Sequence, residues 1–557
     1  MTTRETPRRR PKKTALMSNQ MLVILVGVLS VVLVALLFVS SGLHNSSGTD
    51  ASNTVLGSSG SETSGDTGTS DSIPDTVPEE TTLPPETTLP PETTLPPETT
   101  APAPTLPITP QGGNYINVGS GYIVEVIQNN VETFNGKTSD DYSHTTNNYL
   151  PEGTVDYCAK ELVYNGQTAY VLMRSGHRTY LEKKVYPFEK EPISRLTPEV
   201  KQYKGYLPDH NEIGFASLET VDRHVILTLD SLWKAPFYFK TNQTGYANPS
   251  DGKDRNYAVT SNNASYVDIT FCYATVFSKN VSIPANHPLF KSAELIENES
   301  DFTLRLHLRK KGGLYGWHAY YNDNNQLCFK FLLPAKATAA ENKYGADLTG
   351  VTVMIDVGHG GVDGGAVAYY CETCKLCWSD KKKLIDKKYC PTCNQEVQLH
   401  EESDRNLTLA NALKAELEAV GATVIMNRST DKAININDRL KNLTDTAPDI
   451  CIAIHQNSYS DAKVGGFDTY YFTPWSYVAA KNIAVETKET GIYTKSRYQW
   501  SVNYFMMRQT VCPVILTENG YMSNLDDLIS MIDPGKVEGK AVAIAQGVAD
   551  YFLSINK

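Results

Sequence analysis

Three residues in the C-terminal part of the chain have the types and positions of a shared chemical site. His359 follows the apolar run 351–357, and His455 follows the apolar run 450–454. Glu402 opens a segment whose apolar residues recur every three or four positions, which predicts a helix. In sheets whose strands alternate with helices, ligands gather beyond the carboxyl ends of the strands. We therefore expect these three side chains to converge.

Two imidazoles and one carboxylate are ligands suited to Zn²⁺, and three protein ligands leave the fourth tetrahedral position for water. A single His is more often structural, but glycines on both sides of His359 leave room beside an ion. Glu518 ends the apolar run 514–517 and precedes an Asn-Gly turn, which places it at the same sheet edge. There it could take a proton from water. The alternative for Glu518 is an ordinary turn carboxylate.

The elements around these residues predict the fold class. Apolar strand patterns alternate with helical patterns, which predicts a mostly parallel sheet covered by helices. The expected strands are 351–357, 422–426, 450–454 and 514–517, and the expected helices are 402–420, 434–445 and 536–553. Residues 349–557 are thus expected to form an α/β domain.

Four ordered segments of this domain resemble the signatures of the zinc-dependent N-acetylmuramoyl-L-alanine amidases. They read IDVGHGGVDGGA, ESDRNL, IAIHQNS and ILTENGYMSN. The resemblance implies that His359, Glu402 and His455 are zinc ligands and that Glu518 is the catalytic carboxylate. Glu401 is a rival for the ligand role, but Glu402 keeps the four-residue interval to its following Asn that the family shows.

Two features depart from the family pattern. Val357 replaces the usual Pro, and the segment between Ala366 and Glu402 is unusually long. The resemblance implies a hydrolase that uses zinc-activated water to cut the amide between N-acetylmuramic acid and L-alanine in peptidoglycan. The alternatives are a zinc peptidase acting within stem peptides and a catalytically inactive wall-binding regulatory protein.

The long segment contains a group of closely spaced cysteines. Cys371-x2-Cys374 is followed after fifteen residues by Cys390-x2-Cys393, the spacing of a four-thiolate zinc ribbon. Cys377 could replace a member of the first pair. Because this part is expected to be exported, disulfides are the alternative to a second, structural Zn²⁺. The insert is expected to span 369–396 within the amidase domain.

The N-terminal part predicts a membrane anchor. Residues 1–20 form a basic tail, and the run 21–39 carries no charge, so it is long enough to cross a bilayer. We expect a single helix within 21–42, with the rest of the chain on the extracellular, cell-wall side. A cleaved secretion signal is the alternative. Residues 43–111 are rich in Ser, Thr and Pro and contain three TTLPPE repeats, which predicts a disordered, semi-rigid linker.

The middle of the chain predicts β structure. Tyr-rich alternating runs are separated by Asn, Gly and Asp turns. We expect a small β-barrel-like module over 112–195 and a β-sandwich-like module over 196–335, followed by a linker over 336–348. The modules weakly resemble Src-homology-3-like and amidase N-terminal (AMIN) wall-targeting domains. That resemblance would make exposed aromatics wall contacts, although the same residues could fill β cores. The candidates are Tyr315, Trp317, Tyr320 and Tyr321.

Composition restricts the partners. Lys and Arg together number 51 against 62 Asp and Glu, a net charge of −11, which argues against nucleic acid. The expected partners are peptidoglycan and, through one helix, a membrane. No sequence feature identifies a protein activator.

Overall fold

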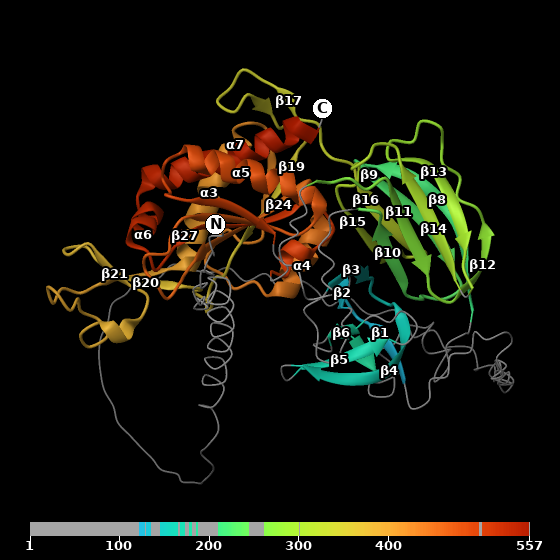
Figure 1. Cartoon of the computed structure of the whole chain (residues 1–557), viewed down its shortest axis with the longest axis horizontal. Coiled ribbons are helices and arrows are strands. Elements are labelled where there is room, and N and C mark those ends of the chain that lie inside the picture. The colour runs from blue at the N-terminus through green and yellow to red at the C-terminus, as the bar shows by residue number, and fades with distance from the viewer. Residues whose placement is uncertain are drawn as a thin grey trace, which may run out of the picture. The chain divides into compact units, whose positions relative to one another are not determined.

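The computed structural model describes residues 122–128, 130–134, 145–164, 167–172, 178–180, 185–187, 210–243, 261–299, 301–500 and 504–555 (Figure 1). The expected basic tail, membrane anchor and linker lie outside these ranges. Among the described residues, no helix has both the length and the apolar character needed to span a bilayer. The anchor therefore stays a prediction.

Antiparallel strands dominate the first described part of the chain, as its alternating pattern predicts. They form a seven-stranded sheet in the order β3-β2-β6-β5-β4-β1-β7. The strands are β1 (Tyr122–Val126), β2 (Val131–Phe134), β3 (Thr145–Leu150), β4 (Val155–Tyr164), β5 (Gln167–Leu172), β6 (Arg178–Tyr180) and β7 (Val185–Pro187). The Src-homology-3-like resemblance stays a prediction.

Two sheets share one apolar core in the next part of the chain. Their orders are β10-β11-β14-β13 and β12-β8-β9-β16-β15. Phe237, Trp317 and Phe329 are among the buried residues of the shared core. The strands are β8 (Asn211–Val221), β9 (His224–Ser231), β10 (Phe237–Thr241), β11 (Tyr266–Phe271), β12 (Ala274–Lys279), β13 (Phe290–Glu297), β14 (Phe302–Leu308), β15 (Trp317–Tyr321) and β16 (Leu327–Leu332). The AMIN-like resemblance and the module boundaries stay predictions.

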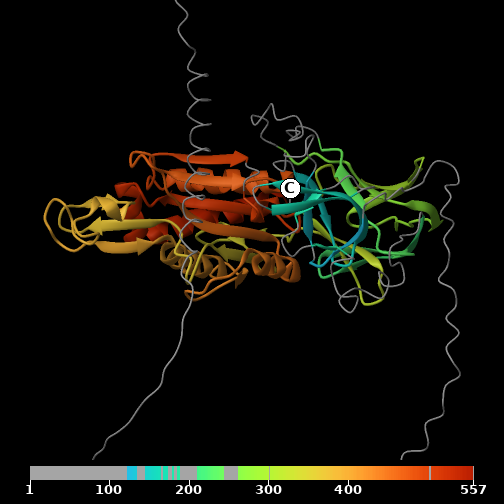
Figure 2. The same cartoon turned by 90° about the horizontal axis from the view of Figure 1, so that it is seen from below.

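A mixed sheet forms the centre of the C-terminal domain (Figures 1 and 2). It has six strands in the order β23-β19-β24-β27-β25-β26. The strands are β19 (Thr352–Val357), β23 (Thr423–Met426), β24 (Ile450–Asn457), β25 (Phe467–Tyr471), β26 (Ser496–Trp500) and β27 (Val514–Tyr521). β25 runs antiparallel to β27, whereas the other neighbouring strands run parallel. The short strands β17 (Thr338–Ala339) and β18 (Ala346–Asp347) pair before this sheet begins.

Helices cover both faces of this sheet, as expected. Successive residues of a strand point to opposite faces. On β19, Val353 and Ile355 belong to the core shared with α3, α5 and α7, while Met354 packs with Leu443 of α4. The helices are α3 (Glu402–Glu418), α4 (Ile436–Thr446), α5 (Tyr477–Glu489), α6 (Leu525–Ile532) and α7 (Pro534–Ile555), with short 3-10 turns at η4 (Pro474–Ser476) and η5 (Met506–Arg508).

β25, β26, α5 and α6 were not expected from the sequence. β25 is almost entirely buried, yet it contains Asp468 and Thr469. The carboxylate of Asp468 is paired with Arg497 from β26. A buried strand whose polar groups are satisfied by a distant partner has no apolar run that a local pattern could reveal.

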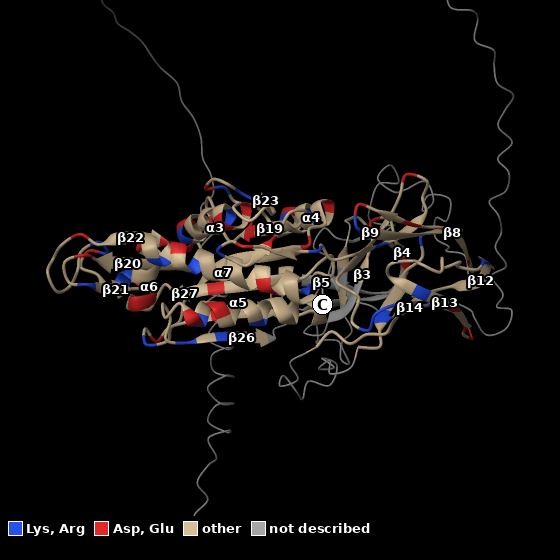
Figure 3. Cartoon of the chain, turned by 90° about the horizontal axis from the view of Figure 1, so that it is seen from above, with Lys and Arg blue, Asp and Glu red and all other residues tan. Residues whose placement is uncertain are grey.

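The cysteine-containing insert forms its own small sheet, in the order β21-β20-β22. It consists of β20 (Val367–Cys371), β21 (Leu376–Trp378), the 3-10 turn η3 (Lys381–Lys383) and β22 (Gln398–Glu401). Ala368 and Tyr370 of β20 pack with Met522, Leu528 and Met531, so the sheet lies beside α6 (Figures 1 and 3).

Candidate active site

His359 lies just beyond β19 in a backbone conformation that is unusual for its residue type. Its φ is 55°, in the left-handed region that non-glycine residues rarely adopt. The surrounding loop is fixed by two buried arginines. Arg428 donates a hydrogen bond to the carbonyl of Gly358 at 2.8 Å, and Arg439 donates to the carbonyl of His359 at 3.2 Å. Such a conformation persists only where neighbouring contacts determine it, as they do here.

Glu402 and His455 approach His359 from two other elements. Glu402 is the first residue of α3 and is buried. Its backbone N–H donates to the carbonyl of Ala366 at 2.8 Å, and its Oε2 accepts from the N–H of Ala366 at 2.9 Å. His455 lies near the end of β24, opposite Glu518 of β27 in the strand register.

The three side chains meet at one point. Oε1 of Glu402 lies 3.2 Å from Nε2 of His359 and 3.0 Å from Nδ1 of His455. One possible ligand atom from each residue lies within 4.8 Å of the others. On the far side of the His359 ring, Nδ1 is 2.8 Å from Oδ2 of Asp363. A carboxylate in this position orients an imidazole so that its other nitrogen faces the site.

Two glycines make room for this group. A Cβ on Gly358 would lie 2.3 Å from Cε1 of His455, and a Cβ on Gly365 would lie 2.6 Å from Oε2 of Glu402. Both distances are too short for real atoms. Gly358 and Gly365 are therefore required for the two side chains to reach the positions that they occupy.

The charges around His359 stabilise the protonated form of its ring. Burial opposes the charged form of His359, but the hydrogen bonds and charges of Glu402 and Asp363 raise its pKa to about 9. Burial also opposes ionisation of Glu402, yet His359 and His455 hold the pKa of that carboxyl well below its usual range. The site therefore favours a positive charge beside the Glu402 carboxylate.

Glu518 lies next to this group on β27 and is buried. Burial raises its pKa to about 7, with the charges of Glu402 and Asp468 acting in the same direction and that of His455 opposing them. Oε2 of Glu518 is buried and has no hydrogen-bond partner among the described residues. A buried carboxylate oxygen without a partner calls for a missing ligand or a catalytic role.

The structure distinguishes between the neighbouring carboxylates Glu401 and Glu402. Glu402 belongs to the His–Glu–His group, whereas Glu401 ends β22 and its carboxylate lies against Gly364. Asp363 and Asp468 were not among the site residues expected from the sequence. Asp363 could have been suspected from its place in the glycine-rich loop between His359 and the insert. No local sequence feature indicates a role for Asp468.

The candidate wall-contacting aromatics have different surroundings. Trp317 is buried and stacks on Phe239 with ring centroids 3.6 Å apart, so it is a core residue. Tyr315, Tyr320 and Tyr321 are partly exposed. A wall-binding role is thus not available to Trp317.

The structure also brings four of the insert cysteines together. Possible ligand atoms of Cys371, Cys374, Cys390 and Cys393 all lie within 4.8 Å of one another. Cys377 faces elsewhere, with its Sγ 3.8 Å from the carbonyl oxygen of Ser523.

Comparisons with known proteins agree with an amidase domain on this sheet. A family model described as N-acetylmuramoyl-L-alanine amidase (Amidase_3) matches residues 353–550. The probable cell wall amidase LytH of Staphylococcus epidermidis is 30% identical over 247 residues, which cover 44% of this chain and 68% of that protein. The N-acetylmuramoyl-L-alanine amidase LytC of Bacillus subtilis is 22% identical over 222 residues, 39% of each chain.

Among solved structures, the catalytic domain of CwlV, an N-acetylmuramoyl-L-alanine amidase from Bacillus (Paenibacillus) polymyxa var. colistinus, aligns with 26% identity and a TM-score of 0.30. The alignment covers 36% of this chain and 97% of that chain. The sequence relationships show that the chain belongs to the N-acetylmuramoyl-L-alanine amidase family.

Proposed function

We propose that this protein is a membrane-anchored cell-wall hydrolase that cuts the amide bond between N-acetylmuramic acid and L-alanine in peptidoglycan. Family membership and the names of its relatives support the amidase class. The observation that carries the proposal is the buried Oε2 of Glu518, which has no hydrogen-bond partner in the described part of the chain and lies beside the His359–Glu402–His455 group.

The donor set of this group fits Zn²⁺. Two imidazole nitrogens and a carboxylate oxygen from three separate elements would hold the ion and leave one position open. The clearance provided by Gly358 and Gly365 is what such a site needs. Bound there, zinc would supply Lewis acidity, polarising the amide carbonyl and making water more acidic.

The chain's own residues supply the remaining chemistry. Glu518 holds a proton at its carboxylate with a pKa raised to about 7, which suits a group that must both accept and donate a proton near neutral pH. We infer that this carboxylate accepts a proton from the attacking water and later delivers it to the leaving nitrogen of L-alanine. Asp363 fixes the His359 ring so that Nε2, not Nδ1, faces the reaction.

The proposed location rests on sequence rather than on the described structure. A basic tail followed by the uncharged run 21–39 would hold the chain in a membrane, and the Pro-rich linker would let the catalytic domain reach the wall. The middle modules would bind peptidoglycan through their partly exposed tyrosines.

Product analysis tests the reaction. The full chain, loaded with zinc, should release stem peptides that begin with a free L-alanine amino group from purified peptidoglycan. Glu518→Gln should retain zinc and lower turnover by about 10²–10⁴-fold, the range typical of general acid–base groups. Cleavage inside the stem peptide, with the muramoyl–alanine bond intact, would instead identify a peptidase. Absence of any hydrolysis by the zinc-loaded chain would identify a binding protein.

A further inference from the structure

Both ends of the insert adjoin residues of the candidate active site. β20 begins two residues after Gly365, and β22 ends at Glu401, immediately before Glu402. The two strands pair with each other, with Val367 opposite Glu401. The two hydrogen bonds between Ala366 and Glu402 continue this pairing to the glutamate itself. A contact that stabilises the fold of the insert therefore also stabilises the position of Glu402.

Apolar burial is a weak source of stability for the outer part of the insert. Leu376 and Ile385 are exposed, at 39% and 42%, while Leu384, Cys371 and Cys390 are buried. A segment with so few buried apolar side chains needs a staple such as a disulfide or a metal. The four cysteines are the candidates for this cross-link, because they lie together and two of them, Cys371 and Cys390, are buried.

The four sulfurs are arranged by two similar turns. In each Cys-x2-Cys unit the residue after the second cysteine is left-handed: Lys375 has φ 51° and Asn394 has φ 56°. Backbone N–H groups point at sulfur in both turns, from Cys374 to Cys371 Sγ at 3.4 Å and from Thr392 to Cys390 Sγ at 3.4 Å. Such N–H groups stabilise negative charge on sulfur, as a thiolate ligand requires.

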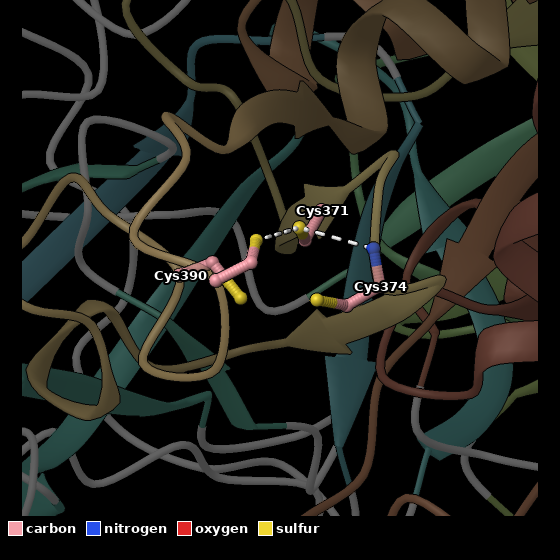
Figure 4. Close-up of side chains that lie close together, drawn as sticks. Cys371, Cys374 and Cys390 are labelled. Carbon is pink, nitrogen blue, oxygen red and sulfur yellow. Dashed lines mark hydrogen bonds between the residues drawn. The ribbon is translucent and has the colours of Figure 1, made fainter.

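The sulfur geometry favours one central ion over two disulfides. Figure 4 shows the side chains of Cys371, Cys374 and Cys390 turned toward one another. Sγ of Cys371 and Sγ of Cys393 are 3.5 Å apart, and the four residues' ligand atoms lie within 4.8 Å of one another. A disulfide requires about 2.05 Å. Zn–S bonds of about 2.3 Å in a tetrahedron place sulfurs roughly 3.8 Å apart.

We propose that Cys371, Cys374, Cys390 and Cys393 bind a second Zn²⁺ as a closed structural site, and that this site positions Glu402 through the β20–β22 strand pair. The metal site stands on the four sulfurs alone, whereas the positioning role rests on the proposed function of Glu402. The insert would thus act as a clamp, meaning that it holds Glu402, one ligand of the catalytic ion, in position. Its packing of Tyr370 against Met522 also ties it to the segment that follows β27.

Metal counting tests the site in the full chain. The wild-type chain should contain about two zinc ions, and the double variant Cys390→Ser/Cys393→Ser about one, because a tetrahedral structural site uses all four thiolates. Cys377→Ser, the matched control outside the sulfur group, should keep both ions. When the wild-type protein is loaded with cobalt, intense sulfur-to-cobalt charge-transfer absorption should appear. A single zinc, or disulfides within the insert by mass mapping of unreduced protein, would overturn the metal site.

A second measurement tests the positioning role. If the insert clamps Glu402, loss of the four-thiolate site should weaken zinc binding at the His–Glu–His group by about 10–100-fold, the usual effect of losing a supporting shell. The affinity is measured by competition with a chelator in the Cys390→Ser/Cys393→Ser variant, with Cys377→Ser as reference. Unchanged zinc affinity at the His–Glu–His group would reject the positioning role while leaving both the thiolate site and the proposed hydrolysis intact.

Discussion

Single residues decide whether this site can hold a cation. Glu401 and Glu402 are adjacent and chemically identical, yet only Glu402 enters the group with His359 and His455. The difference arises because β22 ends and α3 begins between them, so that their side chains leave the backbone in different directions.

Exchanging each glutamate for glutamine should separate these neighbours. Glu402→Gln removes a charged ligand atom, so zinc affinity at the His–Glu–His group should fall by more than the ~10–100-fold that follows loss of an outer partner. Glu401→Gln is the matched control and should bind zinc like the wild type. Chelator competition measures both, and equal losses in the two variants would contradict the assignment.

Zinc uptake by the metal-free protein should depend on pH through His359. The charges of Glu402 and Asp363 raise its pKa to about 9, against the opposing effect of burial, and a protonated imidazole cannot bind a metal. Apparent affinity should therefore rise with pH and level off near that value, changing about tenfold for each pH unit below it.

Asp363→Asn provides the check on this pH dependence. The substitution removes one of the two carboxylates that favour the protonated ring, so the pH at which affinity levels off should move down. Titrations with a chelator corrected for its own protonation give the profile. An affinity that does not change between pH 6.5 and 9 would exclude His359 as the group that titrates.

At the scale of elements, the helices α5 and α7 pack closely against each other within the core on one face of the sheet. α7 crosses α5 at Gly547, where a Cβ would lie 2.5 Å from Cα and 2.6 Å from N of Ile483. Both contacts are with backbone, which cannot move aside without displacing α5. The missing side chain therefore sets the distance between the two helices.

Gly547→Ala should lower the free energy of unfolding. Alanine normally gains about 1 kcal/mol over glycine in a helix, but overpacking against backbone costs about 1–3 kcal/mol. Gly539→Ala lies on the same helix, and its Cβ would meet only the flexible Cδ1 of Ile492 at 3.1 Å. That control should be neutral or stabilising by up to about 1 kcal/mol in denaturant unfolding. Stabilisation by both variants would contradict the close crossing.

At the scale of the whole molecule, the proposed anchor predicts where the chain is found. The uncharged run 21–39 should keep the full chain in the membrane fraction after alkaline extraction, because about 20 apolar residues suffice to cross a bilayer. A chain lacking residues 1–42 should become extractable. Replacing the TTLPPE repeats with a Gly/Ser segment of equal length is the control and should not release the protein. Release of the intact chain would favour the cleaved signal instead.

Much of the C-terminal fold could be predicted from local patterns. The strands around 351–357 and 450–454 and the helix beginning at Glu402 are found where the sequence placed them, because long apolar periodicity reflects a buried face. β25 could not be found in this way. Its buried Asp468 accepts hydrogen bonds from Arg497 and Gln499 of β26 and from Tyr521 of β27, all of them distant in the sequence.

By itself, the sequence determined the chemical types available near the sheet edge, because the apolar runs before His359, His455 and Glu518 are local features of the chain. The turn expected after Glu518 was wrong, since β27 continues to Tyr521. Tertiary structure decided which side chains meet: Glu402 rather than Glu401, and four cysteines without Cys377. It also placed Trp317 in a core and Asp468 beside Glu518. These outcomes depend on contacts between segments far apart in the chain, where direction and distance are set by packing rather than by the order of residues.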